Sequence, residues 1–113
     1  YLTFDDSPTP KFTLWILNLL SSLSIKATFF CIGEFAEKYP EIIDAILNNG
    51  HQIGNHTYSH KNGFLSSNKT YLQDIDRCKN ILPNTNLFRP PYGNMYPWQI
   101  NKIKEKYKII GMC

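Results

Sequence analysis

The chain of 113 residues, of which 42% are hydrophobic and 19% charged, has the composition of one globular domain that can bury a core. Its net charge of +3 comes without any basic run, which argues against a nucleic-acid-binding surface. Three cysteines without a C-x-x-C pair indicate neither a disulfide framework nor a thiolate zinc site, and no apolar run reaches membrane-spanning length.

The first half of the chain alternates strand and helix patterns. Residues 1–4 are apolar and β-prone, and the turn-forming residues 5–8 end them. Thr9 and Pro10 resemble an N-cap and a first-turn proline. The helix that they open is predicted to bury Phe12, Trp15, Ile16, Leu19, Leu20 and Leu23. Residues 25–32 are typical of a strand buried on both faces of a parallel sheet.

The same alternation continues to the end of the chain. Helices are predicted at residues 34–39, 40–50, 70–82 and 97–106, and strands at 51–55, 87–88 and 107–113. Ile42, Ile43, Ile46 and Leu47 should face the core, as should Leu72, Ile75, Cys78, Ile81 or Leu82, Trp98, Ile103 and Tyr107. A polar loop at 61–68 carries Phe64 and Leu65, which we expect to fold over the site.

This order predicts an α/β fold made of βαβ units around a parallel sheet, either open and doubly wound or curled into a barrel. Both ends of the chain fall within strand patterns, and no leader pattern opens it. We therefore expect residues 1–113 to be a single, truncated domain. Three polar clusters follow strands: Asp5 and Asp6, His56 and His60, and residues 89–93. Parallel sheets place active sites at this edge.

His56 and His60 stand four positions apart, which in a tight loop brings both imidazoles within reach of one ion. Hydrogen-bonded structural histidines would show the same spacing. A catalytic zinc site usually takes three protein ligands and leaves one position open for water. With Asp6, the pair makes a two-histidine, one-carboxylate set that suits zinc, and also nickel, cobalt or iron.

Adjacent side chains of a strand point to opposite faces, so Asp5 and Asp6 should do different work. Asp5 can take the proton as a metal-activated water attacks a carbonyl, and Arg89 can hold that carboxylate. Two prolines fix the backbone before Tyr92, whose N–H can serve as an oxyanion donor. Each of these features has a simpler alternative. The aspartate pair could be a strand-ending turn, Arg89 could form a surface salt bridge, and the prolines before Tyr92 could only reverse the chain.

Three motifs together carry a family resemblance. Thr3-Phe4-Asp5-Asp6-Ser7-Pro8, His56-Thr57-Tyr58-Ser59-His60 and Arg89-Pro90-Pro91-Tyr92-Gly93 resemble the first three motifs of the polysaccharide deacetylases, the NodB homology domain or carbohydrate esterase family 4. The resemblance covers nearly the whole chain. It implies a distorted (β/α) barrel, here only partly present, and metal-dependent hydrolysis of N-acetyl, sometimes O-acetyl, groups on chitin-like sugars, peptidoglycan or xylan.

The resemblance also assigns roles to single residues. By motif, Asp5 corresponds to the general base, Arg89 to the residue that holds the base and Tyr92 to the backbone oxyanion donor. Asp6, His56 and His60 correspond to the ligands of a divalent metal, zinc foremost, with cobalt or nickel as alternatives. Thr57 would brace the histidine loop. The family implies an extracellular or cell-envelope location and an acetylated polysaccharide or oligosaccharide as substrate.

The chain also departs from the family pattern. Ser7 stands where glycine is common, and the later motifs are absent, namely an Asp-containing Trp motif and the Leu-x-His motif that supplies the general acid. His51 is the one spare histidine, but it precedes its strand and should lie at the far end of the sheet. A non-catalytic carbohydrate- or metal-binding remnant is therefore the alternative function. A two-histidine, one-carboxylate iron oxygenase fits less well, because those enzymes usually use a β-sandwich.

Overall fold

The computed structural model describes residues 2–111. Tyr1, from the first predicted strand, and Met112 and Cys113, from the last, lie outside this range. Its strands are β1 Leu2–Ser7, β2 Ala27–Cys31, β3 Gln52–Asn55, β4 Leu87–Phe88 and β5 Lys108–Ile109. Its α-helices are α1 Pro10–Leu23, α2 Gly33–Lys38, α3 Pro40–Asn48, α4 Asn68–Ile81 and α5 Pro97–Ile103. The predicted alternation is confirmed, with Pro10, Pro40 and Pro97 in first helical turns.

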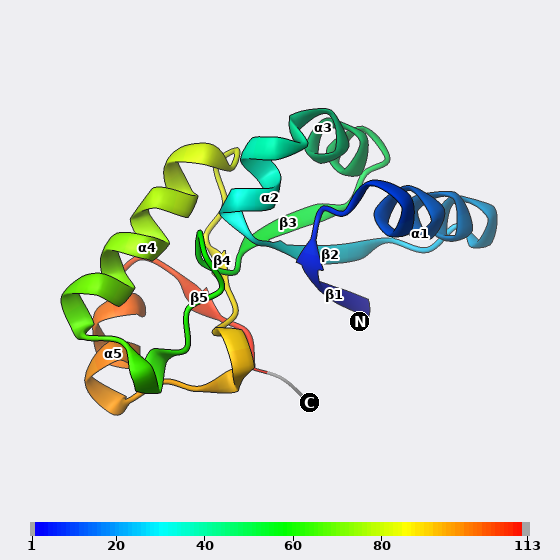
Figure 1. The fold of residues 1–113 in the computed structure, drawn as a ribbon. Helices are drawn as coiled ribbons and strands as arrows, with labels where there is room; N and C mark the ends of the chain where they lie inside the picture. The colour runs from blue at the N-terminus through cyan, green and yellow to red at the C-terminus, as the bar shows by residue number, and fades with distance from the viewer. Residues whose placement is uncertain (1, 112–113) are drawn as a thin grey trace.

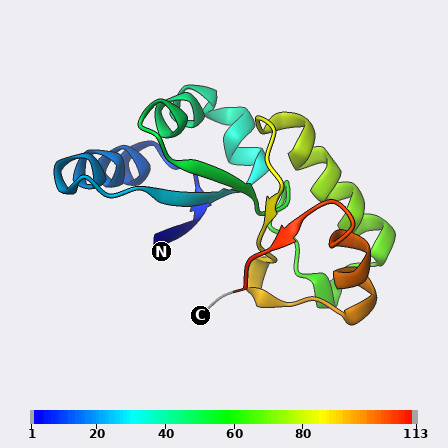
Figure 2. The same ribbon diagram turned by 180° about the vertical axis from the view of Figure 1, so that it is seen from behind.

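The strands form one parallel sheet in the order β1-β2-β3-β4-β5. Each new strand is added at the same edge, which is the winding of a barrel and not that of an open, doubly wound sheet. Figures 1 and 2 show the helices following one another around the outside of the curved sheet. All five residues of β2 are buried, as predicted.

The first strand is longer than predicted. β1 continues through both aspartates to Ser7, whose carbonyl accepts a hydrogen bond from the Ile32 N–H at 2.9 Å. The register with β2 shifts between Phe4 and Ser7, because Phe4 pairs with Phe29 and Ser7 with Cys31. This irregularity lies directly at the aspartate pair, and Asp6 has a φ of 61°.

The predicted buried face of α1 is wrong in part. Ile16 and Leu20 are buried, together with Thr13 and Leu17. The exposed set is Phe12 at 58%, Trp15 at 58%, Leu19 at 41% and Leu23 at 57%. Apolar residues surround most of this helix, so their spacing did not single out the face that meets the sheet. Leu47 and Trp98 are also exposed, at 37% and 54%, at the rims of α3 and α5.

Two apolar clusters stabilise the fold on the helical side of the sheet. The larger one joins α1, α2 and α3 to β2 and β3, and it includes Leu20, Phe29, Ile46 and Ile53. The smaller one consists of Tyr71, Ile75, Phe88, Ile103 and Tyr107. Burial of these side chains fixes the helices against the strands, and thereby fixes where each strand delivers its last residue.

Candidate metal centre

His56 follows β3 directly and is buried, with 2% of its side chain exposed. Its Nδ1 lies 2.7 Å from the carbonyl oxygen of Arg89. A carbonyl only accepts, so this contact places the ring proton on Nδ1 and leaves the Nε2 lone pair free. Burial lowers the pKa of His56, which also favours the neutral ring. A neutral imidazole with a free Nε2 is the form that binds metals.

Asp6, His56 and His60 meet at one point. The Oδ1 atom of Asp6 lies 3.3 Å from Nε2 of His56 and 3.1 Å from Nε2 of His60. The three potential ligand atoms lie within 4.8 Å of one another. Ligands at about 2.0–2.1 Å from a tetrahedral zinc ion stand about 3.3 Å apart. The two distances from Oδ1 of Asp6 therefore match those around such an ion, and all three atoms lie close enough together to share one small divalent cation.

The backbone at this centre is unusual. Of the five non-glycine described residues with positive φ, four belong to the three motifs: Asp6 at 61°, Thr57 at 63°, His60 at 57° and Tyr92 at 62°. This conformation is costly for residues with a Cβ atom, and for a β-branched threonine in particular. Such strain is retained where the surrounding structure enforces it, commonly at functional sites.

The histidine loop is braced by its own polar groups. The Thr57 hydroxyl accepts a hydrogen bond from the Lys61 N–H at 3.1 Å, which agrees with the bracing role that the motif implied. The Asn55 side chain accepts from the Thr57 N–H at 2.9 Å and donates to the carbonyl of Ile75 at 3.0 Å. The start of the loop is thus tied through Asn55 to the end of β3 and to α4, and its end is tied back to Thr57.

Asp5 does not belong to the trio and pairs with Arg89. Nη1 of Arg89 lies 2.8 Å from Oδ1 of Asp5, and the two side chains are 8% and 22% exposed. The same nitrogen donates to the Thr3 hydroxyl at 2.9 Å, and the guanidinium lies over the Phe30 ring at 4.4 Å. This is a half-enclosed ion pair, not the surface salt bridge that the sequence left as an alternative.

Tyr92 stands in the short 3₁₀ turn Pro91–Gly93, with its side chain exposed and its ring 4.7 Å from the ring of His60. The hydrogen bonds that close this turn come from the N–H groups of Gly93 and Asn94. The Tyr92 N–H takes no part in them. All six predicted site residues therefore lie at one edge of the sheet, where β1, β3 and β4 end.

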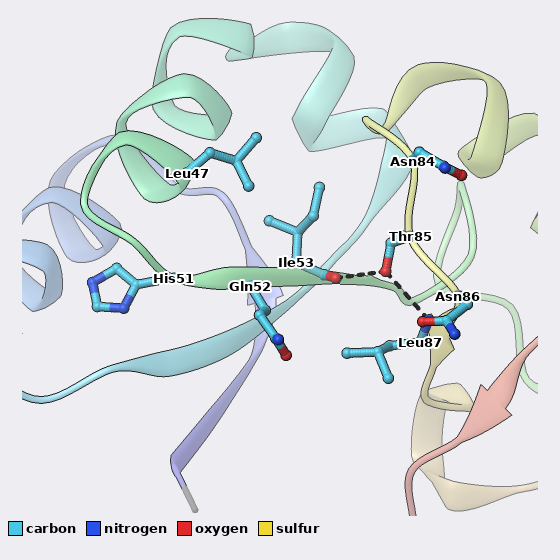
Figure 3. A pocket seen from close by; sticks show the side chains of 8 residues that line it. All are labelled: Leu47, His51, Gln52, Ile53, Asn84, Thr85, Asn86 and Leu87. Carbon is cyan, nitrogen blue, oxygen red and sulfur yellow. Dashed lines mark hydrogen bonds between the residues drawn. The ribbon is translucent and has the colours of Figure 1, made fainter.

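His51 lies at the other end of β3, as predicted, so about 13 Å of strand separates it from the trio. It is buried, and its Nδ1 accepts a hydrogen bond from the Ala27 N–H at 3.1 Å. Figure 3 shows it at the rim of a hollow of about 310 Å³, where Thr85 bonds to the carbonyl of Ile53. His51 cannot serve as an acid at the candidate metal centre.

Contrary to the prediction from the sequence, the structure does not place the apolar residues of the loop after His60 over the candidate metal centre. Phe64 packs against Tyr96, with ring centroids 4.8 Å apart, and Leu65 is 84% exposed, so no described contact folds either over the trio. Sequence reasoning also missed Asp74, a buried carboxylate of α4 that bonds to Ser59 between the two histidines. A polar residue inside a helix does not by itself indicate that its side chain is buried against a loop.

A family model for polysaccharide deacetylases matches residues 1–109, so the chain belongs to the polysaccharide deacetylase family. It is 43% identical over 114 residues to a peptidoglycan-N-acetylglucosamine deacetylase of Bacillus cereus, across 96% of this chain and 42% of that protein. A chitooligosaccharide deacetylase of Azorhizobium caulinodans is 37% identical over 99 residues, across 82% of this chain and 47% of that protein.

The fold is shared with a solved member of the family. The crystal structure of the peptidoglycan N-acetylglucosamine deacetylase Bc1960 matches with a TM-score of 0.92 at 40% identity, across 96% of this chain and 53% of that one. This likeness confirms the predicted α/β fold with part of a NodB-type barrel. The chain spans only about half the length of these relatives. Within residues 2–111, no helix is both long and apolar enough to cross a membrane.

Proposed function

We propose that the protein is a metal-dependent hydrolase that removes N-acetyl groups, and in some substrates O-acetyl groups, from an acetylated glycan such as peptidoglycan or a chitin-like oligomer. The observation that carries this proposal is the convergence of Asp6, His56 and His60 beside the Asp5–Arg89 pair. The named substrates of the relatives support the choice of glycan. Because these glycans lie in cell walls or outside the cell, we also propose an extracellular or cell-envelope location.

Asp6, His56 and His60 would hold the cation, with zinc preferred and cobalt or nickel as alternatives. A divalent cation bound there would polarise the acetyl carbonyl and lower the pKa of the attacking water. The hydrogen bond between Nδ1 of His56 and the Arg89 carbonyl orients the Nε2 atom of that ring toward Asp6, where it would bind the cation.

Asp5 is the proposed general base, because it is the carboxylate that faces the site without belonging to the trio. Nη1 of Arg89 donates both to Oδ1 of Asp5 and to the Thr3 hydroxyl, and these contacts fix the orientation of the Asp5 side chain. Accepting the proton of the attacking water is worth about 10²–10⁴ in rate for a well-placed base. Arg89 acts through Asp5 and is a positioning residue.

The Tyr92 N–H is the proposed donor to the oxyanion that forms as water adds to the acetyl carbon. It is not used to close its own turn, and the Tyr92 ring against His60 keeps this segment beside the trio. A backbone donor held rigidly toward the developing charge needs no reorganisation during the reaction.

A second candidate is a carbohydrate- or metal-binding module without catalysis. The observation that favours it is the placement of His51, since no other histidine of residues 2–111 remains to protonate the leaving amine. The hydrolase and the binding module differ in whether acetate is released.

The test is acetate release from acetylated chito-oligosaccharides and from peptidoglycan by the full-length protein. The hydrolase proposal predicts release that stops with a chelator, returns with added Zn²⁺ or Co²⁺, and is lost in Asp5→Asn. Saturable binding of the glycan without acetate supports the binding module instead. Release that is insensitive to both the chelator and Asp5→Asn refutes the mechanism.

A further inference from the structure

The loop between the two histidines is attached to helix α4 through Asp74. The Asp74 carboxylate accepts two hydrogen bonds from Ser59, one from its backbone N–H at 2.9 Å and one from its hydroxyl at 2.8 Å. Asp74 is only 7% exposed. A buried carboxylate is costly unless it is hydrogen-bonded. The two hydrogen bonds from Ser59 offset the cost of burying the Asp74 carboxylate.

The surrounding backbone confines the loop from two sides. On the α4 side, the Tyr58 N–H donates to the Asp74 carbonyl at 3.2 Å. On the α2 side, the N–H groups of Gly33 and Glu34 donate to the carbonyls of Thr57 and Tyr58, both at 2.9 Å. Residues 57–59 are therefore hydrogen-bonded to α2 or α4, and Ser59 directly precedes His60.

The two histidines differ in how their rings are oriented. The ring of His56 is buried and bonded to the Arg89 carbonyl. The ring of His60 is 26% exposed, and in the described part of the chain its only polar contact is with Asp6. Its other neighbours are the rings of His56 and Tyr92. The direction of the His60 ring therefore depends on the backbone of Ser59 and of His60, and His60 has a φ of 57°.

We propose that Asp74 is a positioning residue for the metal centre: by holding Ser59 at two atoms, it sets the direction of His60 and thereby the affinity and geometry of the bound cation. This inference rests on the metal site of the proposed function. It goes further in assigning a role to a residue outside the three motifs, on a helix that contributes no ligand.

The test measures Zn²⁺ and Co²⁺ binding to the metal-free full-length protein by calorimetry. Asp74→Ala should weaken both affinities about 10–100-fold, the usual cost of losing a group that orients a metal ligand. The absorption bands of the Co²⁺ form should shift, because His60 no longer approaches at its native angle. Asp76→Ala is the matched control: it removes an exposed carboxylate from the same helix and should leave both affinities within about twofold.

Two further variants keep the inference testable if Asp74→Ala does not fold, as judged by circular dichroism. Asp74→Asn keeps the shape and one acceptor oxygen, so it should bind metal more tightly than Asp74→Ala. Ser59→Ala removes only the hydroxyl bond and should weaken binding several-fold, with no added effect in an Asp74→Ala background, because the two residues act as one unit.

The outcomes separate this inference from the proposed function. A native protein that binds neither cation at the trio refutes both. Tight binding by the native protein, with unchanged affinity and cobalt spectrum in folded Asp74→Ala and in Ser59→Ala, refutes the role of Asp74 alone. Weaker binding in these variants but not in Asp76→Ala supports it.

Discussion

Arg89 and Asp5 are 84 residues apart in the chain, yet Nη1 of Arg89 lies 2.8 Å from Oδ1 of Asp5. The contact joins the end of β4 to the first strand, across β2 and β3. Arg89 also donates to the carbonyls of Ile110 and Gly111, at 3.4 and 3.3 Å, beyond β5. One guanidinium thus connects the two edge strands of the sheet.

Replacing Arg89 by lysine should lower both stability and activity. The single ammonium cannot reproduce a planar fork that bonds to Asp5, Thr3 and two carbonyls at once. We expect the free energy of unfolding to fall by about 1–3 kcal/mol, the cost of leaving buried polar groups unpaired. Urea denaturation measures this change, and an unchanged midpoint and slope would contradict the structural role of Arg89.

Asp5→Asn should separate metal binding from turnover. The amide keeps the size of the side chain but cannot accept the proton of the attacking water, so acetate release should fall about 10²–10⁴-fold. Zinc content should stay at the native level, since Asp5 lies outside the trio. Metal analysis and acetate assays on one preparation check both halves. Loss of zinc together with activity would instead place Asp5 among the ligands.

Asp6→Ala should abolish tight metal binding. Two histidines alone lack the third protein ligand of a catalytic zinc site, and we expect the affinity for Zn²⁺ to fall by on the order of 100-fold or more. His51→Gln is the control, because it changes a histidine at the opposite end of β3. Equal zinc affinities in Asp6→Ala and His51→Gln would remove the case for the candidate metal centre.

His51 should also make stability depend on pH. Burial, aided by the charge of Lys26, lowers the pKa of His51 below its ordinary value of 6.5. The unfolded chain therefore binds this proton more readily, and the free energy of unfolding falls as pH drops below about 6.5. Between about pH 7.5 and about pH 5, His51→Gln should lose less stability than the native protein. His56 is present in both proteins, so its own contribution cancels; equal losses would contradict the assignment.

Much of the centre could be predicted because parallel strands deliver their last residues to one edge. Asp6, His56 and Arg89 each follow or end a strand pattern, and this placement brought them together in the prediction without any knowledge of side-chain geometry. Asp5 and Asp6 have separate partners, as expected, although the chain at Asp6 departs from a regular strand.

Other features had no signal in a pattern of apolar and polar residues. Apolar side chains surround α1, so Phe12 and Trp15 appeared equivalent to Ile16 until the helix was packed on the sheet. Asp74 has a polar side chain in a helix, which usually indicates an outward position, and its partner Ser59 lies in a loop without periodicity. Burial of a polar group depends on the partner that satisfies it, and only the folded structure supplies that partner.

The register shift in β1 has a consequence for transplanting this centre to another scaffold. In an uninterrupted strand, the spacing along β1 would be regular, whereas here the chain turns at Asp6 with a φ of 61° and resumes its pairing at Ser7. A graft that copies the carboxylates and imidazoles onto an ideal strand would therefore misdirect one of the two aspartates. A graft therefore has to reproduce the irregular main chain of β1 together with the side chains.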